Sequence, residues 1–109
     1  MKRSEPTEAH QEESKRLLAL WDIRKKLTQA EFGKTFNVGN QSYVWQCLHG
    51  KVILNLKTAM AFATHLRCPL YAFSTRLDDE LAVYVNFDNE QRALIATDRL
   101  FTRRELDEP

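Results

Sequence analysis

The chain has few of the residues that stabilise small domains through covalent bonds or metals. Its 109 residues include two cysteines, three glycines and three prolines. Cys47 and Cys68 lie in no CxxC or Cys/His spacing, so the sequence predicts neither a disulfide framework nor a zinc site. We expect both to be small buried side chains.

Long apolar runs are also missing. No stretch could cross a membrane, and the first thirty residues are polar rather than signal-like. We therefore expect a cytoplasmic protein without membrane association. His10, His49 and His65 have no carboxylate or cysteine partner at a recognisable spacing, and no glycine-rich phosphate loop occurs. The sequence thus predicts no enzymatic activity, no cofactor and no metal, and it indicates no small-molecule ligand.

Charge is distributed unevenly along a chain whose formal net charge is only +1. Residues 1–76 carry twelve Lys and Arg against six Asp and Glu, whereas residues 77–109 carry four against nine. The front part is therefore suited to a polyanion, and the acidic tail is not. Ordinary solvated faces that happen to segregate would give the same balance.

The spacing of apolar residues predicts a mainly α fold. Residues 1–10 are polar and lack periodicity, so we expect a disordered arm there. A first helix with a basic outer face is expected from about Glu12 to Leu27, because apolar residues recur there at helical spacing. These residues are Leu17, Leu20, Trp21, Ile23 and Leu27.

Two short helices joined by a tight turn follow. Thr28 and Glu31 have the spacing of a capping box, which predicts a second helix over residues 29–36. Gly33 in that helix is a poor helix former, so we expect another helix to approach closely there. After a turn at residues 37–39, a third helix is predicted over residues 41–48, with Gly50 as its C-terminal glycine.

A fourth helix is predicted from an N-cap at Asn55 to about Leu66. Its expected inner face consists of Leu56, Ala59, Met60, Ala63 and Leu66. A short turn over residues 70–73 would complete a five-helix domain spanning residues 11–77.

The acidic extension, residues 78–109, has a different pattern. Residues 81–87 alternate and are rich in β-branched and aromatic side chains, which is typical of a strand. Residues 92–97 could form the return strand of a hairpin. A C-terminal helix over residues 89–106 is the alternative, because its helix propensities are good. We favour the hairpin, since the apolar residues of that segment form no stripe on a helical wheel.

The second and third helices have the arrangement of a helix-turn-helix unit. Val44, Cys47 and Leu48 fall at positions that would anchor the short third helix to the core. Amide and hydroxyl groups on its other face suit the edges of DNA bases. We expect Gln41 and Ser42 to reach bases first, followed by Tyr43 and Gln46. A merely solvated helix start is the alternative.

The runs LTQAEFGKTFNVGNQSYVWQCLHGK and LNLKTAMAFATHLRCPLYAFSTRL resemble the helix-turn-helix domain of phage lambda-type repressors and Cro proteins, the XRE family. The similarity covers roughly residues 15–77, and Asn40 is an extra residue relative to the commonest turn. The resemblance implies a sequence-specific DNA-binding regulator, such as a phage or prophage repressor. It also implies a homodimer on a two-fold operator in double-stranded DNA.

The resemblance also implies roles for single residues. Gln29 would bind a phosphate and brace Gln41, while Ser42 and Gln46 would face the bases. His49 and Lys51 would approach the sugar-phosphate backbone. From their charge and position, we also expect Lys34 and Lys57 to bind phosphates.

The tail suggests a second role. A strand containing Val83, Tyr84, Val85 and Phe87 would need a partner for its free edge and apolar face, so we expect a dimerisation element. Packing against the helices of the same subunit is the alternative. A different class of function also fits: an antitoxin-like protein-binding module that autoregulates through its helix-turn-helix.

Overall fold

The structure, a computed structural model, describes residues 5–107, with side chains described for residues 5–97. This part of the chain contains helices and no strand. Contacts divide the chain into a first unit, Met1–Asp78, and a second, Asp79–Pro109. The helices are α1 (Glu8–Arg24), α2 (Gln29–Thr35), α3 (Gln41–Leu48), α4 (Leu56–Leu66), the 3-10 turn η1 (Leu70–Ala72) and α5 (Thr75–Asp107). The predicted mainly α fold is confirmed.

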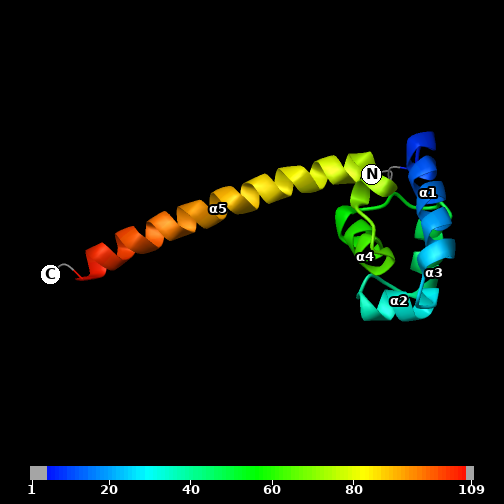
Figure 1. The fold of residues 1–109 in the computed structure, drawn as a ribbon, viewed down its shortest axis with the longest axis horizontal. Helices are drawn as coiled ribbons and strands as arrows, with labels where there is room; N and C mark the ends of the chain where they lie inside the picture. The colour runs from blue at the N-terminus through cyan, green and yellow to red at the C-terminus, as the bar shows by residue number, and fades with distance from the viewer. Residues whose placement is uncertain (1–4, 108–109) are drawn as a thin grey trace. The chain divides into compact units, whose positions relative to one another are not determined.

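The first unit is built around an aromatic cluster. Trp21 meets Phe32 and Phe62 edge-on, with ring centroids 5.4 and 5.9 Å apart, and Phe32 stacks on Phe62 at 4.5 Å. These rings come from α1, α2 and α4, so the cluster joins three helices. Helix α3 packs against both α1 and α2 (Figure 1). Large apolar side chains drive this association, because burying each one contributes about 1.5–3 kcal/mol.

Helix α1 begins at Glu8, four residues before the expected start. Thr7 caps it, accepting a hydrogen bond from the His10 backbone N–H, while the His10 ring accepts one from the Thr7 N–H. This reciprocal cap was missed because histidine replaces the usual Glu or Gln. Of the expected arm, residues 8–10 therefore belong to α1, and residues 1–4 lie outside the described residues.

The connection between α2 and α3 is fixed at both ends. Thr28 and Glu31 form the predicted capping box. Asn37 then adopts a left-handed conformation with φ of 53°, and the Val38 N–H donates to the Gly33 carbonyl, a Schellman ending. A Cβ on Gly33 would collide with the Gly39 carbonyl oxygen. Close packing at Gly33 is confirmed, but the nearest neighbour is the turn at Gly39; the expected helix contributes only Val44 of α3, somewhat farther away.

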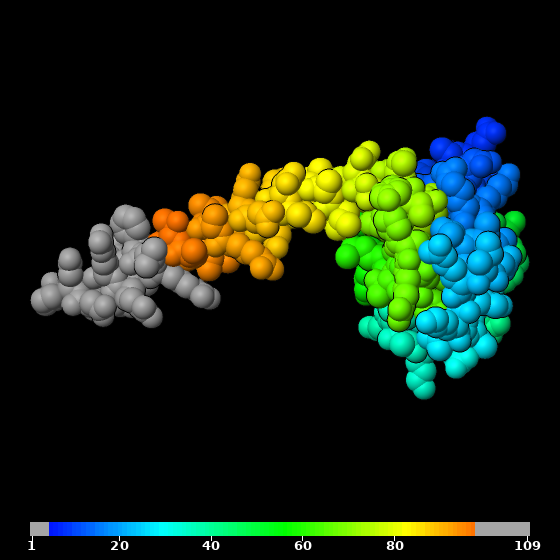
Figure 2. Space-filling view, viewed as in Figure 1, coloured from blue at the N-terminus to red at the C-terminus, as the bar shows by residue number. Residues whose placement is uncertain are grey.

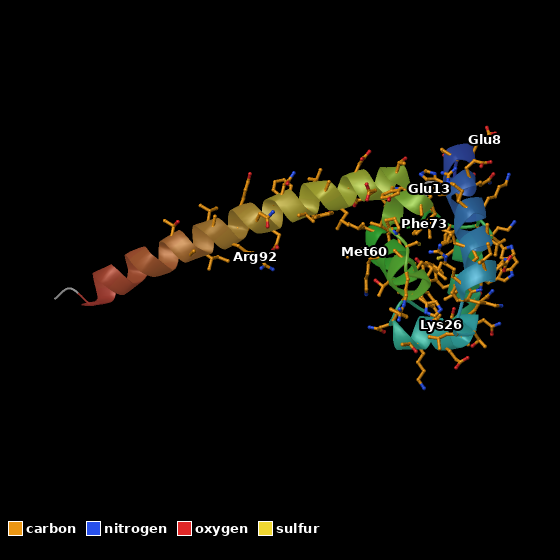
Figure 3. The ribbon with its side chains drawn as sticks, in the orientation of Figure 1. Glu8, Glu13, Lys26, Met60, Phe73 and Arg92 are labelled. Carbon is orange, nitrogen blue, oxygen red and sulfur yellow. The ribbon has the colours of Figure 1, made fainter. Side chains whose placement is uncertain are left out.

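Helix α4 starts as predicted but presents a different face to the core. Asn55 caps it by accepting from the Thr58 N–H at 2.8 Å. Met60, expected on the inner face, is 43% exposed (Figure 3), whereas Phe62 and His65 are buried. The buried face of α4 is thus rotated relative to the predicted one. Phe62 packs against Trp21 of α1 and Phe32 of α2, and this leaves Met60 facing solvent.

The last segment of the first unit is held against α1. Arg16 Nε donates to the Phe73 carbonyl at 3.2 Å, and Figure 2 shows blue α1 beside the yellow-green segment that leads into α5. Buried Glu13 accepts two hydrogen bonds from Arg76, at 3.2 and 2.9 Å, and one from the Ser74 hydroxyl. Ser74 also accepts from the Leu77 N–H and so caps α5. Glu13 and Phe73 are labelled close together in Figure 3.

The second unit is a continuation of helix α5, so the predicted hairpin is wrong. Residues 92–97 are helical, as the alternative had it. Residues 81–87, expected as a strand in both cases, are helical too, because α5 already begins at Thr75. Between Leu70 and Glu108 the sequence has no glycine or proline to make a turn. An isolated two-stranded hairpin is also marginally stable in water, and the described residues offer no third strand.

The predicted dimerisation residues lie on this helix, and all of them are exposed. Val83, Tyr84, Val85 and Phe87 are 48–58% exposed, and Leu94 and Ile95 are 60% and 49% exposed. At 3.6 residues per turn, Val83, Phe87 and Leu94 share one face, whereas Val85 lies on the opposite side. Within the described residues, none of the helices has the length and apolar content that a bilayer crossing requires.

Candidate functional site

Helix α3 is short, and both of its ends are capped by hydrogen bonds. Asn40 is its N-cap and accepts from the Tyr43 N–H at 2.9 Å. At the other end Gly50 has a φ of +70°, and the Lys51 N–H donates to the Gln46 carbonyl at 3.0 Å. Val44, Cys47 and Leu48 are buried, as expected from their spacing. An eight-residue helix is marginal alone, so this anchoring is what stabilises it.

The outward strip of α3 is polar. Gln41 and Ser42, at the leading end, are exposed, and Gln46 one turn on donates from Nε2 to the Ser42 hydroxyl at 3.3 Å. Backbone N–H groups in the first turn of a helix have no intrahelical partner, so this end presents donors as well as side chains. Gln41, Ser42 and Gln46 therefore form one hydrogen-bonding surface.

Tyr43 is placed differently from the other three predicted base-reading residues. Its side chain is half-buried, and its hydroxyl lies 3.3 Å from the Thr58 hydroxyl on α4. Burial raises the pKa of Tyr43, so it stays a neutral phenol near neutral pH. Burial likewise raises the pKa of the neighbouring Cys47 thiol to about 11, which leaves it unreactive. Tyr43 braces α3 against α4 rather than pointing straight outward.

The predicted phosphate-binding residues lie on three segments. Gln29 is the first residue of α2, Lys34 is in its last turn, and Lys57 is the second residue of α4; both lysines are exposed. The amide oxygen of Gln29 is buried and has no hydrogen-bond partner among the described residues. Gln29 makes no hydrogen bond to Gln41 there, so the bracing role implied by the resemblance stays a prediction.

A further cation, Lys15 of α1, lies beside this surface, where it lines a cavity of about 310 Å³. The cavity is lined by His49, Gly50 and Lys51 after α3 and by Gln11, Ser14 and Lys15 of α1, with Leu18 and Leu48. Lys15 belongs to the basic outer face that was expected for the first helix. Its proximity to His49 and Lys51 depends on the packing of α1 against α3, which no local pattern reveals. Glu12 lies 3.4 Å from the Lys15 ammonium and offsets part of its charge.

The start of α2 is tied to α4 through a buried histidine. His65 Nε2 accepts from the Lys26 backbone N–H at 3.2 Å, in the connection just before Thr28 (Lys26 is labelled in Figure 3). Its ring lies 5.6 Å from Trp21 and 5.3 Å from Phe32, between centroids. Burial, and then the charge of Lys26, lower the pKa of His65, so the ring is a neutral acceptor. This bond holds the connection between α1 and α2 against α4.

No family model matches the chain, and a search of curated proteins also gave no match. Within the described part of the chain, no group of three or more His, Cys, Asp and Glu side chains is placed to hold a metal ion. The chemistry of the site is thus that of amide and hydroxyl groups beside lysines and a histidine.

Proposed function

We propose that α2, the turn and α3 form a helix-turn-helix unit, and that the protein is a sequence-specific DNA-binding regulator. The observation that carries this proposal is the two-sided character of α3: one side is buried, and the other exposes Gln41 and Ser42, with half-buried Gln46 bonded to Ser42. A short helix held in this way can enter a major groove with its polar side leading. The resemblance to lambda-type repressors and Cro proteins of the XRE family supports the same function.

The exposed groups suit base edges. A glutamine amide pairs with adenine through two hydrogen bonds, and a hydroxyl can meet any base. Gln41 and Ser42 are the primary readers, and Gln46, already bonded to Ser42, supports them. Tyr43, half-buried against Thr58, contributes its ring edge at most. In its simplest form the protein is a phage or prophage repressor that occludes a promoter in the cytoplasm of a bacterial host, with no enzymatic activity.

Phosphate contacts would place this surface on the duplex. Gln29, Lys34, His49, Lys51 and Lys57 form the predicted set, and Lys15 joins it beside the cavity. If about three cations per subunit contact phosphates in a dimer, log affinity should fall against log salt with a slope of about −5. Affinity that does not depend on salt would contradict the proposal.

Selection of bound duplexes from random DNA, followed by affinity measurements on the recovered site, tests the proposal. Gln41→Ala should weaken binding by about 1–3 kcal/mol and relax specificity at one position, because an adenine loses its partner. Lys51→Ala should weaken binding to all sequences about equally. Lys25→Ala, an exposed lysine outside the predicted set, is the matched control. If Gln41→Ala and Lys51→Ala bind like the control, the assignment of α3 fails.

We also propose that the protein is a homodimer held by the exposed face of α5. A helix surrounded by water does not expose this many large apolar side chains without a partner to cover them, and a two-fold operator requires a two-fold protein. The second copy is the simplest occupant of that face. Val83, Tyr84 and Phe87 would contact it, joined by Leu94 from the same side, whereas Val85 points elsewhere by helical spacing.

The solution mass tests the dimer. Phe87→Glu should convert it to a monomer, since a charge in an apolar helix pair is strongly unfavourable. Asn89→Glu adds the same charge to an exposed position on the other side of the helix, and should leave the mass unchanged. Equal masses for the wild type and both variants would rule out this face.

The acidic character and exposed apolar side chains of α5 favour a second function. The same acidic, apolar helix could cover a different protein, as in an antitoxin that sequesters a toxin and regulates its own gene. Co-purification of the product of a neighbouring gene, in a fixed ratio, would favour that function. A homodimer that binds its own promoter tightly would favour the repressor.

A further inference from the structure

Trp45 is the large aromatic side chain of α3 that the proposed base-reading and anchoring roles leave unused. It is 44% exposed, while Trp21 in the core is 2% exposed. Its ring stacks on His49, with centroids 4.2 Å apart and planes 23° apart. Trp45 and His49 are four residues apart, so the two rings form one stacked unit at the C-terminal end of α3. A half-exposed tryptophan is a side chain that is enriched at interfaces, because its ring is apolar and its N–H is polar.

The position of the pair on α3 narrows the choice of partner. By helical spacing, Ser42, Gln46 and His49 follow the middle of the outward side, and Trp45 lies on one flank of it. Tyr43 lies on the opposite flank, where its hydroxyl meets Thr58 of α4. A helix 10–12 Å across fills a major groove about 12 Å wide, so its flanks meet the groove walls. Those walls are deoxyribose and phosphate.

The surroundings of the pair are cationic. His49 shares a cavity with Lys51 and with Lys15 of α1. Positive charge at that place complements phosphate, and the flat face of the indole complements the C–H surface of deoxyribose. Both chemistries therefore occur side by side, continuous with the proposed reading surface.

We propose that the stacked Trp45 and His49 form a contact site for the DNA backbone, with Trp45 against deoxyribose and His49 directed to the adjacent phosphate. This inference rests on the proposed function. Trp45 has two roles in it: it covers a sugar, and its stacking holds the imidazole in position. Because deoxyribose carries no sequence information, the contact adds affinity to operator and non-operator duplexes alike.

Fluorescence quenching by acrylamide tests the contact directly, because the chain has only two tryptophans. Trp45→Phe leaves buried Trp21 as the sole emitter, so subtracting its signal from that of the wild type isolates Trp45. We expect Trp45 to be quenched in the free protein. It should be protected by the duplex recovered from random DNA and by an unrelated duplex of equal length.

The salt dependence of binding provides the second readout. Trp45→Ala should weaken binding about tenfold, as expected for losing the burial of part of an indole, without changing the salt slope. Lys51→Ala, an ionic contact, should instead reduce the magnitude of the slope by about 0.9 per phosphate lost. Circular dichroism of Trp45→Ala verifies that the helices remain.

The possible outcomes separate the two proposals. If the wild type binds no duplex, the proposed function fails and this inference fails with it. If the wild type binds with the expected salt slope but Trp45 stays accessible in the complex, only the inference is overturned. Protection by the selected duplex alone would also overturn it, because that result indicates a base contact.

Discussion

The two units of the chain use similar side chains in opposite ways. In the first unit Trp21, Phe32 and Phe62 are buried against one another, and α1, α2 and α4 depend on that contact. In the second unit Tyr84 and Phe87 are more than half exposed on a helix. Aromatic content therefore does not by itself indicate a core. What matters is whether other elements of the same unit can cover the rings.

Truncating one phenylalanine in each unit should give the largest contrast. Phe62→Ala should destabilise the protein by about 3–5 kcal/mol, because it opens a cavity in a packed cluster. Phe87→Ala should change the free energy of unfolding of the dilute protein by less than about 0.5 kcal/mol. Urea unfolding followed by tryptophan fluorescence measures both. A large loss for Phe87→Ala that grows with protein concentration would show that a second copy covers this face.

The carboxylates of Glu13 and Glu12 offer a smaller contrast within the first unit. Glu13→Gln should cost about 1–3 kcal/mol, because a buried carboxylate that accepts from Arg76 and Ser74 is replaced by a poorer acceptor. Glu12→Gln should cost less than about 0.5 kcal/mol, since the ion pair of Glu12 with Lys15 is exposed. The same unfolding measurement applies. If Glu13→Gln costs as little as Glu12→Gln, the bonds from Glu13 of α1 to Ser74 and Arg76 contribute no more stability than an exposed ion pair.

The pH dependence of stability should give the smallest effect. Because the folded protein holds the pKa of His65 below its usual value near 6.5, the unfolded chain binds a proton more readily. The stability that neutral His65 contributes is therefore fully present above about pH 6.5. It is lost progressively as the pH falls towards the pKa of His65 in the folded protein. Unfolding at pH 7.5 and pH 5.5 measures the loss.

His65→Gln is the control for that measurement, because glutamine keeps an acceptor for the Lys26 N–H but does not titrate. Its stability should fall less between the two pH values. The two proteins differ only at residue 65, so the difference isolates His65. Identical pH profiles would mean that His65 contributes nothing to the pH dependence.

The parts of the candidate site that could be predicted are those set by neighbouring residues. Thr28 and Glu31 fixed the start of α2, and the limits of α3 followed from Gln41 and Gly50. By contrast, Lys15 lies near His49 and Lys51 only because α1 packs on α3. The inward turn of Tyr43 depends on Thr58, fifteen residues away. The reciprocal cap at Thr7 and His10 was local but used an unusual partner.

The strand prediction for residues 81–87 failed for a related reason. Alternation of apolar residues predicts a strand only when a sheet exists to receive it, and the described residues contain no other strand. Without glycine or proline the segment continues as a helix, on which Val83 and Phe87 share a face and Val85 does not. The apolar surface that this produces is unlike the one that alternation predicts.

The sequence by itself determined the mainly α class, the boundaries of α2 and α3 and the buried stripe Val44, Cys47 and Leu48, because hydrogen bonds in caps and turns act over three or four residues. Only the tertiary structure decided that His65 is a buried acceptor, that Met60 faces solvent and that Trp45 is partly exposed and stacks on His49. Burial depends on which distant elements meet, and spacing along the chain does not carry that information.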